Sequence, residues 1–291
     1  MKHIDDVDFY LMDLESKFKK INPKEYYLSY SGGKDSHFLY WFIKEWLHDT
    51  EIEVVGVNTF MEHHEILQRI LKNCDTVLLP KLKPMEIKDK YGIPCFSKWQ
   101  DDMIDRYQRG CRRPYLMERI TGINQETGEA IGGRFRLNKK AKEGALNGTL
   151  HKISPQCCNQ LKKTPIKEYE KKTGKKPILG VRGSEGALRS TQYRSCFTKS
   201  GKFTPLHDLS DELLEQIYKK YNIELPEVYH YIDRTGCMGC PYGSHYGDVE
   251  KELALIKPSQ KKFVCEYFKE SYAVLGINTQ VPVQMTIFDN K

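Results

Sequence analysis

Hydrophobic positions along this chain follow two alternating patterns, a helical spacing and short continuous runs. The first helical stretch, 5–20, carries four apolar residues on one face: Val7, Leu11, Leu14 and Phe18. Short apolar runs bounded by polar or glycine-rich turns alternate with further helical stretches, as buried strands alternate with helices. The pattern predicts helices over 5–20, 37–47, 62–73, 164–173, 211–221 and 249–274, and strands over 26–30, 52–57, 76–79 and 178–181.

Strands that alternate with helices at this spacing indicate β-α-β units. The sequence therefore predicts the α/β class, with a doubly wound and mainly parallel sheet. In such sheets the carboxyl ends of the strands lie along one edge, and ligands usually bind there. The turns that follow the first two predicted strands are accordingly the first places to look for a site.

One segment, 121–152, differs from the rest because basic residues outnumber acids in it. Its basic residues include Arg134, Arg136, Lys139, Lys140, Lys142 and Lys152. We interpret this segment as a basic, mobile insertion. It could be a lid over an active site, a nucleic-acid contact or a solvated surface loop, and the sequence leaves these three alternatives open.

Composition narrows the class of protein. The chain has 291 residues, of which 39% are hydrophobic and 29% are charged, so one large or two small domains are expected. No stretch approaches the roughly 18 apolar residues of a membrane span, and the first twenty residues lack the apolar run of a signal peptide. We therefore expect a soluble, cytoplasmic protein with no membrane contact.

Nine cysteines and a net charge of +7 remain to be explained. A reducing compartment disfavours disulfides, so metal binding or catalysis is the use to test, with inert buried thiols as the alternative. The modest basic excess permits a nucleic-acid partner without requiring one.

A glycine turn joins the first predicted strand to the second predicted helix. It consists of Ser31, Gly32, Gly33, Lys34, Asp35 and Ser36. The glycines let backbone N–H groups converge on an anion at a helix N-terminus, and Lys34 adds a positive charge for a phosphate. Asp35 could hold Mg²⁺ or cap the helix. The turn therefore predicts a phosphate-binding site and is not a Walker motif.

Four cysteines form two close pairs, Cys157-Cys158 and Cys237-x-x-Cys240. A Cys-x-x-Cys turn presents two thiolates to one metal, and adjacent cysteines are poorly placed to form a disulfide with each other. Four sulfur ligands suit zinc or an iron–sulfur cluster. The other five cysteines are expected to be buried free thiols, and Cys196 is the one among them closest to other functional candidates.

The turn Ser-Gly-Gly-Lys-Asp-Ser resembles the pyrophosphate loop of the adenine nucleotide alpha hydrolase superfamily, whose members cleave ATP between its α- and β-phosphates. The resemblance implies that 31–36 bind ATP with Mg²⁺, and that Lys34 and Asp35 take part in catalysis. Asn58 and Thr59 follow the second strand, where the superfamily often has Asp-Thr beside the adenosine. We therefore include Asn58 and Thr59 among the nucleotide-binding residues.

Three further segments resemble the PAPS/APS reductase family within that superfamily. They are Cys-Cys-x₃-Lys-x-x-Pro at 157–165, Gly-Val-Arg-Gly-Ser-Glu with a later arginine at 180–189, and Pro-Leu-His-Asp followed by Gly-Cys-Met-Gly-Cys-Pro within 205–241. The resemblance covers roughly 25–250. It implies a [4Fe-4S] cluster held by Cys157, Cys158, Cys237 and Cys240. Arg182 and Arg189 are candidate catalytic residues, and Arg182 is also a candidate for nucleotide binding. Each could serve as a guanidinium fork for phosphate, sulfate or a carboxylate, with structural ion pairs as the alternative.

This chain departs from the family at two points. Gly186 stands where a serine is usual, and the family's cysteine nucleophile near the C-terminus has no counterpart, since the last cysteine, Cys265, lies within a predicted helix. A complete pyrophosphate loop also favours hydrolysis of ATP itself. The preferred hypothesis is ATP-dependent sulfur transfer to a nucleic acid or metabolite. Reduction of APS or PAPS, with a thiol from Cys265, Cys196 or a partner, and a non-catalytic nucleotide- and cluster-binding subunit or sensor are the alternatives.

The residue pattern and the resemblance together divide the chain. The pattern predicts an N-terminal helix within 1–22, and the resemblance implies a nucleotide-binding α/β domain at 23–234, with the insertion 121–152, followed by a cluster-bearing helical extension at 235–291. Adenine nucleotide, a thiol or sulfur-donor protein and a nucleic-acid substrate are the partners it suggests, and the protein could form a homodimer.

Overall fold

The computed structural model describes residues 6–132, 136–183, 193–232, 235–246 and 249–280. Contacts divide the chain into two compact units, each assembled from separate stretches. The first unit comprises Met1–Asn58, His64–Leu79 and Pro165–Tyr229, and the second comprises Thr59–His63, Pro80–Thr164 and His230–Lys291. Neither unit is contiguous in sequence, whereas the division suggested by the sequence was.

A four-stranded, all-parallel sheet forms the centre of the first unit, with the strand order β3-β2-β1-β4. Its strands are β1 Tyr26–Tyr30, β2 Glu53–Val57, β3 Thr76–Leu78 and β4 Lys176–Ile178. In the register of the sheet, Ser29 lies opposite Val55, which in turn lies opposite Thr76. The predicted α/β class and parallel sheet are confirmed, although β4 lies two to three residues earlier than the predicted strand.

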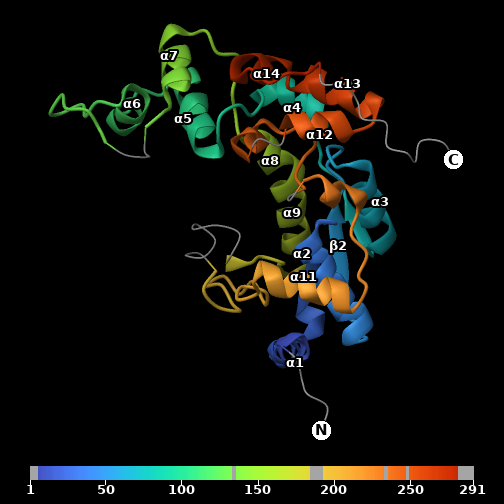
Figure 1. Ribbon diagram of the computed structural model, residues 1–291. Helices are drawn as coiled ribbons and strands as arrows, with labels where there is room; N and C mark the ends of the chain where they lie inside the picture. Colours follow the sequence, from blue (N-terminus) through green and yellow to red (C-terminus); the bar gives the residue numbers. More distant parts are fainter. Residues whose placement is uncertain (1–5, 133–135, 184–192, 233–234, 247–248, 281–291) are drawn as a thin grey trace. The chain divides into compact units, whose positions relative to one another are not determined.

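Helices cover both faces of this sheet (Figure 1). On one face, Tyr27 of β1 packs against Tyr169. On the other face, the Tyr30 hydroxyl contacts His37 at 2.9 Å and Asn73 at 2.9 Å. Because side chains alternate along a strand, Tyr27 and Tyr30 point to opposite faces. The arrangement is consistent with the predicted doubly wound fold.

The helices of the first unit lie close to their predicted positions. They are α1 Asp6–Phe18, α2 Lys34–Trp41, α3 His64–Asn73, α9 Thr164–Thr173 and α11 Asp211–Lys220, with a π-helical turn Phe42–Trp46 after α2 and 3₁₀ turns at Pro23–Glu25 and Glu227–His230. Ser210 caps α11 by accepting a hydrogen bond from the Leu213 amide at 3.1 Å. Among the described residues, no helix is long and apolar enough to cross a bilayer.

The second unit is built from helices around two apolar cores. Its helices are α4 Pro84–Tyr91, α5 Lys98–Gln108, α6 Pro114–Thr121, α7 Lys139–Asn147, α8 Gln156–Cys158, α12 Val249–Leu255, α13 Pro258–Tyr267 and α14 Lys269–Leu275, with a π-helical turn Asn159–Lys163 and a 3₁₀ turn Pro241–Tyr246. One core joins α4 and α8 to α12–α14. The other holds α5, α6 and α7 together (Figure 1).

The central part of the segment 121–152 is helical, so a solvated surface loop, one of the three alternatives, does not describe it. This part forms α7, and Leu137, Ala141 and Ala145 are buried in the core shared with α5 and α6. Asn138 caps α7 by accepting from the Ala141 amide at 2.8 Å. This helix was missed in the sequence because its apolar residues are few and are spaced among lysines, so the helical period is weak. Arg134 lies outside the described residues.

The single helix predicted over 249–274 is instead three helices, α12, α13 and α14. Pro258 occupies the first turn of α13, where its missing N–H is tolerated, but it could not continue α12. The last cysteine, Cys265, therefore lies in α13, as expected of a helical residue.

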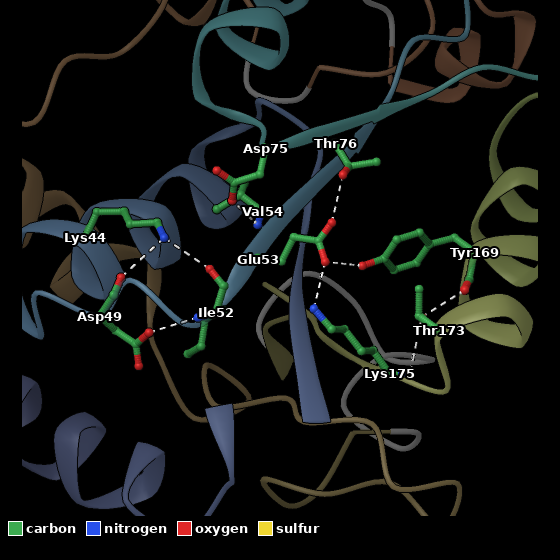
Figure 2. Close-up of polar contacts among 10 residues, drawn as sticks. All are labelled: Lys44, Asp49, Ile52, Glu53, Val54, Asp75, Thr76, Tyr169, Thr173 and Lys175. Carbon is green, nitrogen blue, oxygen red and sulfur yellow. Dashed lines mark hydrogen bonds and ion pairs between the residues drawn. The ribbon is translucent and has the colours of Figure 1, made fainter. Parts of the chain in front are cut away.

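Glu53, on β2, joins several elements at one side of the sheet (Figure 2). Its carboxylate accepts hydrogen bonds from Thr76 at 2.7 Å, Tyr169 at 2.6 Å and Lys175 at 2.7 Å. Burial raises the pKa of Glu53, but these three hydrogen bonds outweigh it, and the pKa lies below its ordinary value. The network fixes α9 to β2 and β3.

Replacement of Glu53 by glutamine should lower the free energy of unfolding by about 1–2 kcal/mol at neutral pH, since Lys175 loses its charged acceptor. Because the folded pKa lies below the unfolded one, the stabilisation is full above the unfolded pKa and is lost as pH falls through the folded pKa. Urea unfolding of wild type and Glu53→Gln at neutral and acidic pH checks this. Glu51→Gln, at an exposed ion pair, is the control and should change stability by less than about 0.5 kcal/mol. Equal effects of the two substitutions would contradict the assignment.

Candidate functional site

The turn 31–36 connects β1 to α2 in the first unit. Gly32 has φ +74°, and a Cβ there would lie 2.9 Å from the Ile66 side chain and 3.1 Å from the Ile66 carbonyl oxygen. Only glycine meets both the positive φ and the close approach of α3. Gly33 then directly precedes α2 in an extended conformation. The predicted strand, glycine turn and helix are therefore present in the predicted order.

The two serines of the turn are bonded to each other. Ser36 Oγ accepts from the Ser31 amide at 3.2 Å and donates to the Gly33 carbonyl at 3.0 Å. Ser31 Oγ lies 3.0 Å from Ser36 Oγ. Because the Ser36 hydroxyl proton already goes to the Gly33 carbonyl, Ser31 is the donor of this bond. These bonds fix the backbone of the turn and leave the Lys34 side chain outside the network.

Two tyrosines hold the first residue of α2. The Lys34 amide donates to the Tyr229 hydroxyl at 2.9 Å, and the Tyr218 hydroxyl donates to the Lys34 carbonyl at 2.6 Å. The free amides of a first helical turn also favour anions, since the helix dipole is positive there. A phosphate oxygen at this helix terminus would therefore compete with Tyr229 for the Lys34 amide.

Arg182 joins the first turns of α2 and α11. Its side chain is 2% exposed, Nε donates to Asp35 at 2.5 Å, and Nη1 donates to Asp211 at 2.7 Å. Burial lowers the pKa of the Arg182 guanidinium, but the two carboxylates outweigh it and raise the pKa above its ordinary value. Of the two roles considered for Arg182, the structural ion pair is the one these contacts describe, and Asp35 is its partner.

The chain after β4 approaches the same helical turn. A Cβ at Gly180 would lie 2.9 Å from the Asp35 carbonyl carbon and 3.0 Å from the Ser36 nitrogen. Glycine at 180 is therefore required by this backbone contact, because a side chain would push α2 away. The glycine of the Gly-Val-Arg segment thus serves to bring Arg182 beside Asp35.

Asn58 and Thr59, the other predicted nucleotide-binding residues, belong to different units. The Asn58 amide donates to the Leu78 carbonyl at 3.0 Å, at the end of β2. Thr59 is 1% exposed and belongs to the second unit, where its amide and hydroxyl both donate to the Glu62 carboxylate. Arg189 and Glu185 lie in 184–192, outside the described residues.

The four cysteines predicted as metal ligands lie together in the second unit. Cys157 and Cys158 form α8, and Cys237 and Cys240 precede the 3₁₀ turn Pro241–Tyr246. The pKa of Cys157 lies well above its ordinary value because of a hydrogen bond with Cys158, burial and the nearby thiols of Cys158, Cys240 and Cys237. Two segments far apart in sequence therefore bring four thiols within electrostatic reach of one another.

Positive charge also gathers at this group of thiols. The hydrogen bond from Cys157, together with the cations Lys98, Lys162 and Lys163, lowers the pKa of Cys158 despite burial. A lowered pKa favours the thiolate, which is the form that ligates metals. Burial raises the pKa values of Cys237 and Cys240.

Lys162 is half-buried and interacts with a thiol and a carboxyl group. It hydrogen-bonds to Cys237, and the charges of Cys237 and then Glu62 raise the pKa of Lys162 above its ordinary value despite burial. Glu62 is itself held by both donors of Thr59. The lysine of the Cys-Cys-x₃-Lys segment thus contributes a fixed positive charge beside the thiols.

The Cys-x-x-Cys turn is fixed by its backbone. Gly239 has φ +58°, and a Cβ there would collide with Tyr272 and Val264. The Gly239 amide donates to Glu252 at 2.8 Å, and its carbonyl accepts from the Tyr272 hydroxyl at 2.5 Å. The other carboxylate oxygen of Glu252 lies 2.5 Å from His63 Nε2. These bonds set the direction of the two thiols on either side of Gly239.

A buried carboxyl group holds the residues after this turn. Asp101 is 0% exposed and accepts from the amides of Cys95 at 2.7 Å and Phe96 at 3.0 Å, and from the Tyr242 hydroxyl at 2.8 Å. Burial raises the pKa of Asp101 to about 6 although these hydrogen bonds oppose it. Asp101 therefore anchors Tyr242, two residues after Cys240.

The donor set fits a soft metal or an iron–sulfur cluster. Four cysteine sulfurs with a lysine beside them match sulfur-ligated zinc or [4Fe-4S] in chemistry. As the side chains stand, no group of three or more His, Cys, Asp or Glu in the described part of the chain has the arrangement of a bound ion. The side chains therefore match a sulfur-ligated metal or cluster in donor type and in their grouping, but they do not have the geometry of a filled site.

All nine cysteines are free thiols. Burial raises the pKa values of Cys74 and Cys95 to about 12, so both are inert at neutral pH. Cys196 Sγ lies 3.9 Å from His207 Nδ1, and burial raises its pKa as well. Cys265 is half-buried in α13, also with a raised pKa.

Several supporting residues could not have been found from the sequence. His63, Glu252, Asp101, Tyr242 and Tyr272 come from distant segments and belong to no short motif. Gly239 is the exception among these supporting residues, because a glycine inside a Cys-x-x-Cys turn indicates that another part of the chain packs closely against the backbone there. Comparisons with protein-family models and with curated proteins find no match to this chain. The chemistry of both sites is therefore inferred from their own residues.

Replacement of Arg182 by methionine should destabilise the protein by about 3 kcal/mol, because the Asp35 carboxyl group would be left at a 15% exposed position without its cation. Arg106→Met, which removes a more exposed ion pair with Asp102, is the matched control and should cost less than about 1 kcal/mol. Urea unfolding followed by circular dichroism measures both. Similar losses in the two variants would refute the bridging role of Arg182.

Proposed function

We propose that the protein binds ATP at 31–36, holds a [4Fe-4S] cluster on Cys157, Cys158, Cys237 and Cys240, and transfers sulfur to a nucleic acid or metabolite with release of AMP and pyrophosphate. The observation that carries the proposal is the gathering of the four thiols from two distant segments beside Lys162. The turn between β1 and α2 supports the nucleotide half. Both features suit a member of the PAPS/APS reductase family, cluster-bearing branch, within the adenine nucleotide alpha hydrolase superfamily.

The reaction we propose has two displacements. An oxygen of the acceptor attacks the α-phosphorus of ATP, and the bond to the leaving pyrophosphate breaks. Hydrosulfide, delivered to the site by the sulfur-donor protein, then forms the new bond to sulfur as the C–O or P–O bond to AMP breaks; AMP leaves with the displaced oxygen, and the hydrosulfide proton passes to solvent. The cluster, when bound, would supply iron that carries sulfur or acts as a Lewis acid.

The protein groups at 31–36 stabilise the charge of the leaving group in this scheme. The amides at the start of α2 and the Lys34 ammonium would bind phosphate oxygens, with Mg²⁺ accompanying the nucleotide. Arg182 is assigned a positioning role, because it donates to two carboxylates and holds Asp35 at the first turn of α2. Arg189 stays a candidate for direct contact with the nucleotide.

A nucleic acid is the acceptor class that the second unit favours. Helix α7 presents exposed Lys139 and Lys140, and Arg136 precedes it. Nearby, the Arg112 guanidinium lies 3.8 Å from the Tyr107 ring centre, and Tyr115 is 53% exposed. Lysines, arginines and exposed aromatic rings are the groups that bind phosphates and stack on bases.

Anaerobically purified protein should be brown and contain about four irons per chain. Cys157→Ala and Cys240→Ala should each remove the colour, because each removes one thiol of the four, whereas Cys265→Ala in α13 should keep it. Metal analysis and visible absorption measure the outcome, with circular dichroism to confirm folding. Colourless wild-type protein with one zinc would exclude the cluster.

The anaerobic protein should release pyrophosphate and AMP from ATP when a sulfur donor and a nucleic-acid acceptor, either transfer RNA or DNA, are supplied. Lys34→Gln should lower this rate by about 100-fold, because a positive charge at the leaving group is lost. Lys24→Gln, at an exposed surface lysine, is the control.

Parallel incubations with APS and PAPS, scored for sulfite, separate the alternatives. Sulfite formation that depends on Cys196 or Cys265 would support sulfonucleotide reduction in place of sulfur transfer. Binding of ATP without turnover of ATP, APS or PAPS would leave a non-catalytic subunit or sensor.

A further inference from the structure

A separate cavity of about 900 Å³ lies in the first unit among α2, α3 and the segment after α11. Its lining residues come from all three elements: His37, Tyr40, Trp41, Glu45, Gln68, Arg69, Lys72, Asn73, Tyr221, Asn222, Ile223 and Glu224. None of these belongs to 31–36, and none is a cysteine. The volume is that of a pocket for a small organic ligand.

Arg69 lines the cavity, and one of its two terminal guanidinium nitrogens has no hydrogen-bond acceptor in the part of the chain that the structure describes. Its Nη2 donates to the Glu224 carbonyl at 2.7 Å, which fixes the direction of the guanidinium. Nη1 is buried and makes no hydrogen bond within the described residues. A buried charged donor without an acceptor is costly, and a ligand oxygen in the cavity would satisfy it.

His37 adds a second donor, and its hydrogen bonds set the tautomer. Asn73 donates to the Tyr30 hydroxyl, so the Tyr30 proton is free to go to His37 Nδ1, 2.9 Å away. Burial, with the charges of Arg69 and Lys72, lowers the pKa of His37 to about 3, so the ring is neutral. A neutral ring that accepts at Nδ1 carries its proton on Nε2 and can donate there.

Charge is unevenly distributed over the walls. Helix α3 contributes both cations, Arg69 and the exposed Lys72, which lies one turn further along. The acids Glu45 and Glu224 lie on the other two walls and are exposed. An anionic group would therefore bind along α3, and hydroxyl or amino groups of the same ligand could reach the acids.

Flat rings make up much of the remaining wall. Tyr40 stacks on His37 with an interplanar angle of 11°, and Trp41 contacts Tyr221 with ring centres 4.9 Å apart. Such rings favour a planar, aromatic ligand group. The ligand must thus combine an anion with several acceptor oxygens and a planar ring.

We propose that this cavity binds a nucleoside monophosphate, with the phosphate on Arg69, Lys72 and His37 and the base against Tyr40, Trp41 and Tyr221. A free nucleotide and the phosphorylated end of a nucleic-acid strand present this same chemistry, and the test distinguishes them. This site goes beyond the proposed ATP site and uses none of its residues.

The test measures binding of thymidine 5′-monophosphate to the full-length protein by calorimetry, up to about 1 mM. Arg69→Gln and Lys72→Gln should each weaken binding by at least about tenfold, and thymidine without phosphate should bind at least about tenfold more weakly. Lys167→Gln, an exposed lysine on α9, is the matched control and should leave affinity unchanged. Thermal melting confirms that Arg69→Gln is folded, and Lys72, exposed and without an ion pair among the described residues, provides an independent variant.

Two comparisons complete the test. Short oligothymidylate with a 5′-phosphate competes if the cavity takes a strand end, and the same strand with a 5′-hydroxyl should not. Binding that persists in Lys34→Gln supports the separate cavity, whereas loss in Lys34→Gln would assign the nucleotide to 31–36 and overturn the proposal. No binding of the monophosphate or of the phosphorylated strand, or equal affinity in Arg69→Gln, would also overturn it.

Discussion

The buried guanidinium of Arg182 is the interaction on which the first unit's site depends. A charge at a 2% exposed position is tolerated only when carboxylates neutralise it, and Asp35 and Asp211 do so from two helices. Because Asp35 is in the first turn of α2 and Gly180 touches the same turn, the end of β4 and the turn 31–36 are held in one arrangement. The glycine turn is therefore shaped by contacts outside its own six residues.

In the second unit, neutral and acidic side chains hold the backbone that carries the four thiols. Four thiols can converge only if the backbone carrying them is held, and here Glu252 and Tyr272 bond both sides of Gly239 while Asp101 anchors Tyr242. Lys162 then places a positive charge beside the sulfurs. The positions of the thiols are therefore set by residues of separate helices as well as by the short Cys-x-x-Cys motif.

Sequence patterns predicted the sheet and the helices of the first unit because their apolar runs and periods are strong, as in β1 and α9. They failed where polar residues dominate a helix, as in α7, and where a proline interrupts an otherwise helical stretch, as at Pro258. The turn and the thiol pairs were visible as local motifs. The pairing of Arg182 with Asp211, or of His63 with Glu252, was not, because long-range side-chain contacts leave no local signature.

The pairing of Tyr26 with Lys176 has a consequence for how the chain assembles during its synthesis. β4 is made long after β1, β2 and β3, and most of the second unit is made in between. The sheet is thus left with an open β1 edge on the ribosome until β4 emerges, and such an edge can pair with other chains. Slow translation between 80 and 164 would prolong that exposure. The same interleaving of the two units means that a single proteolytic cut could not release either unit whole.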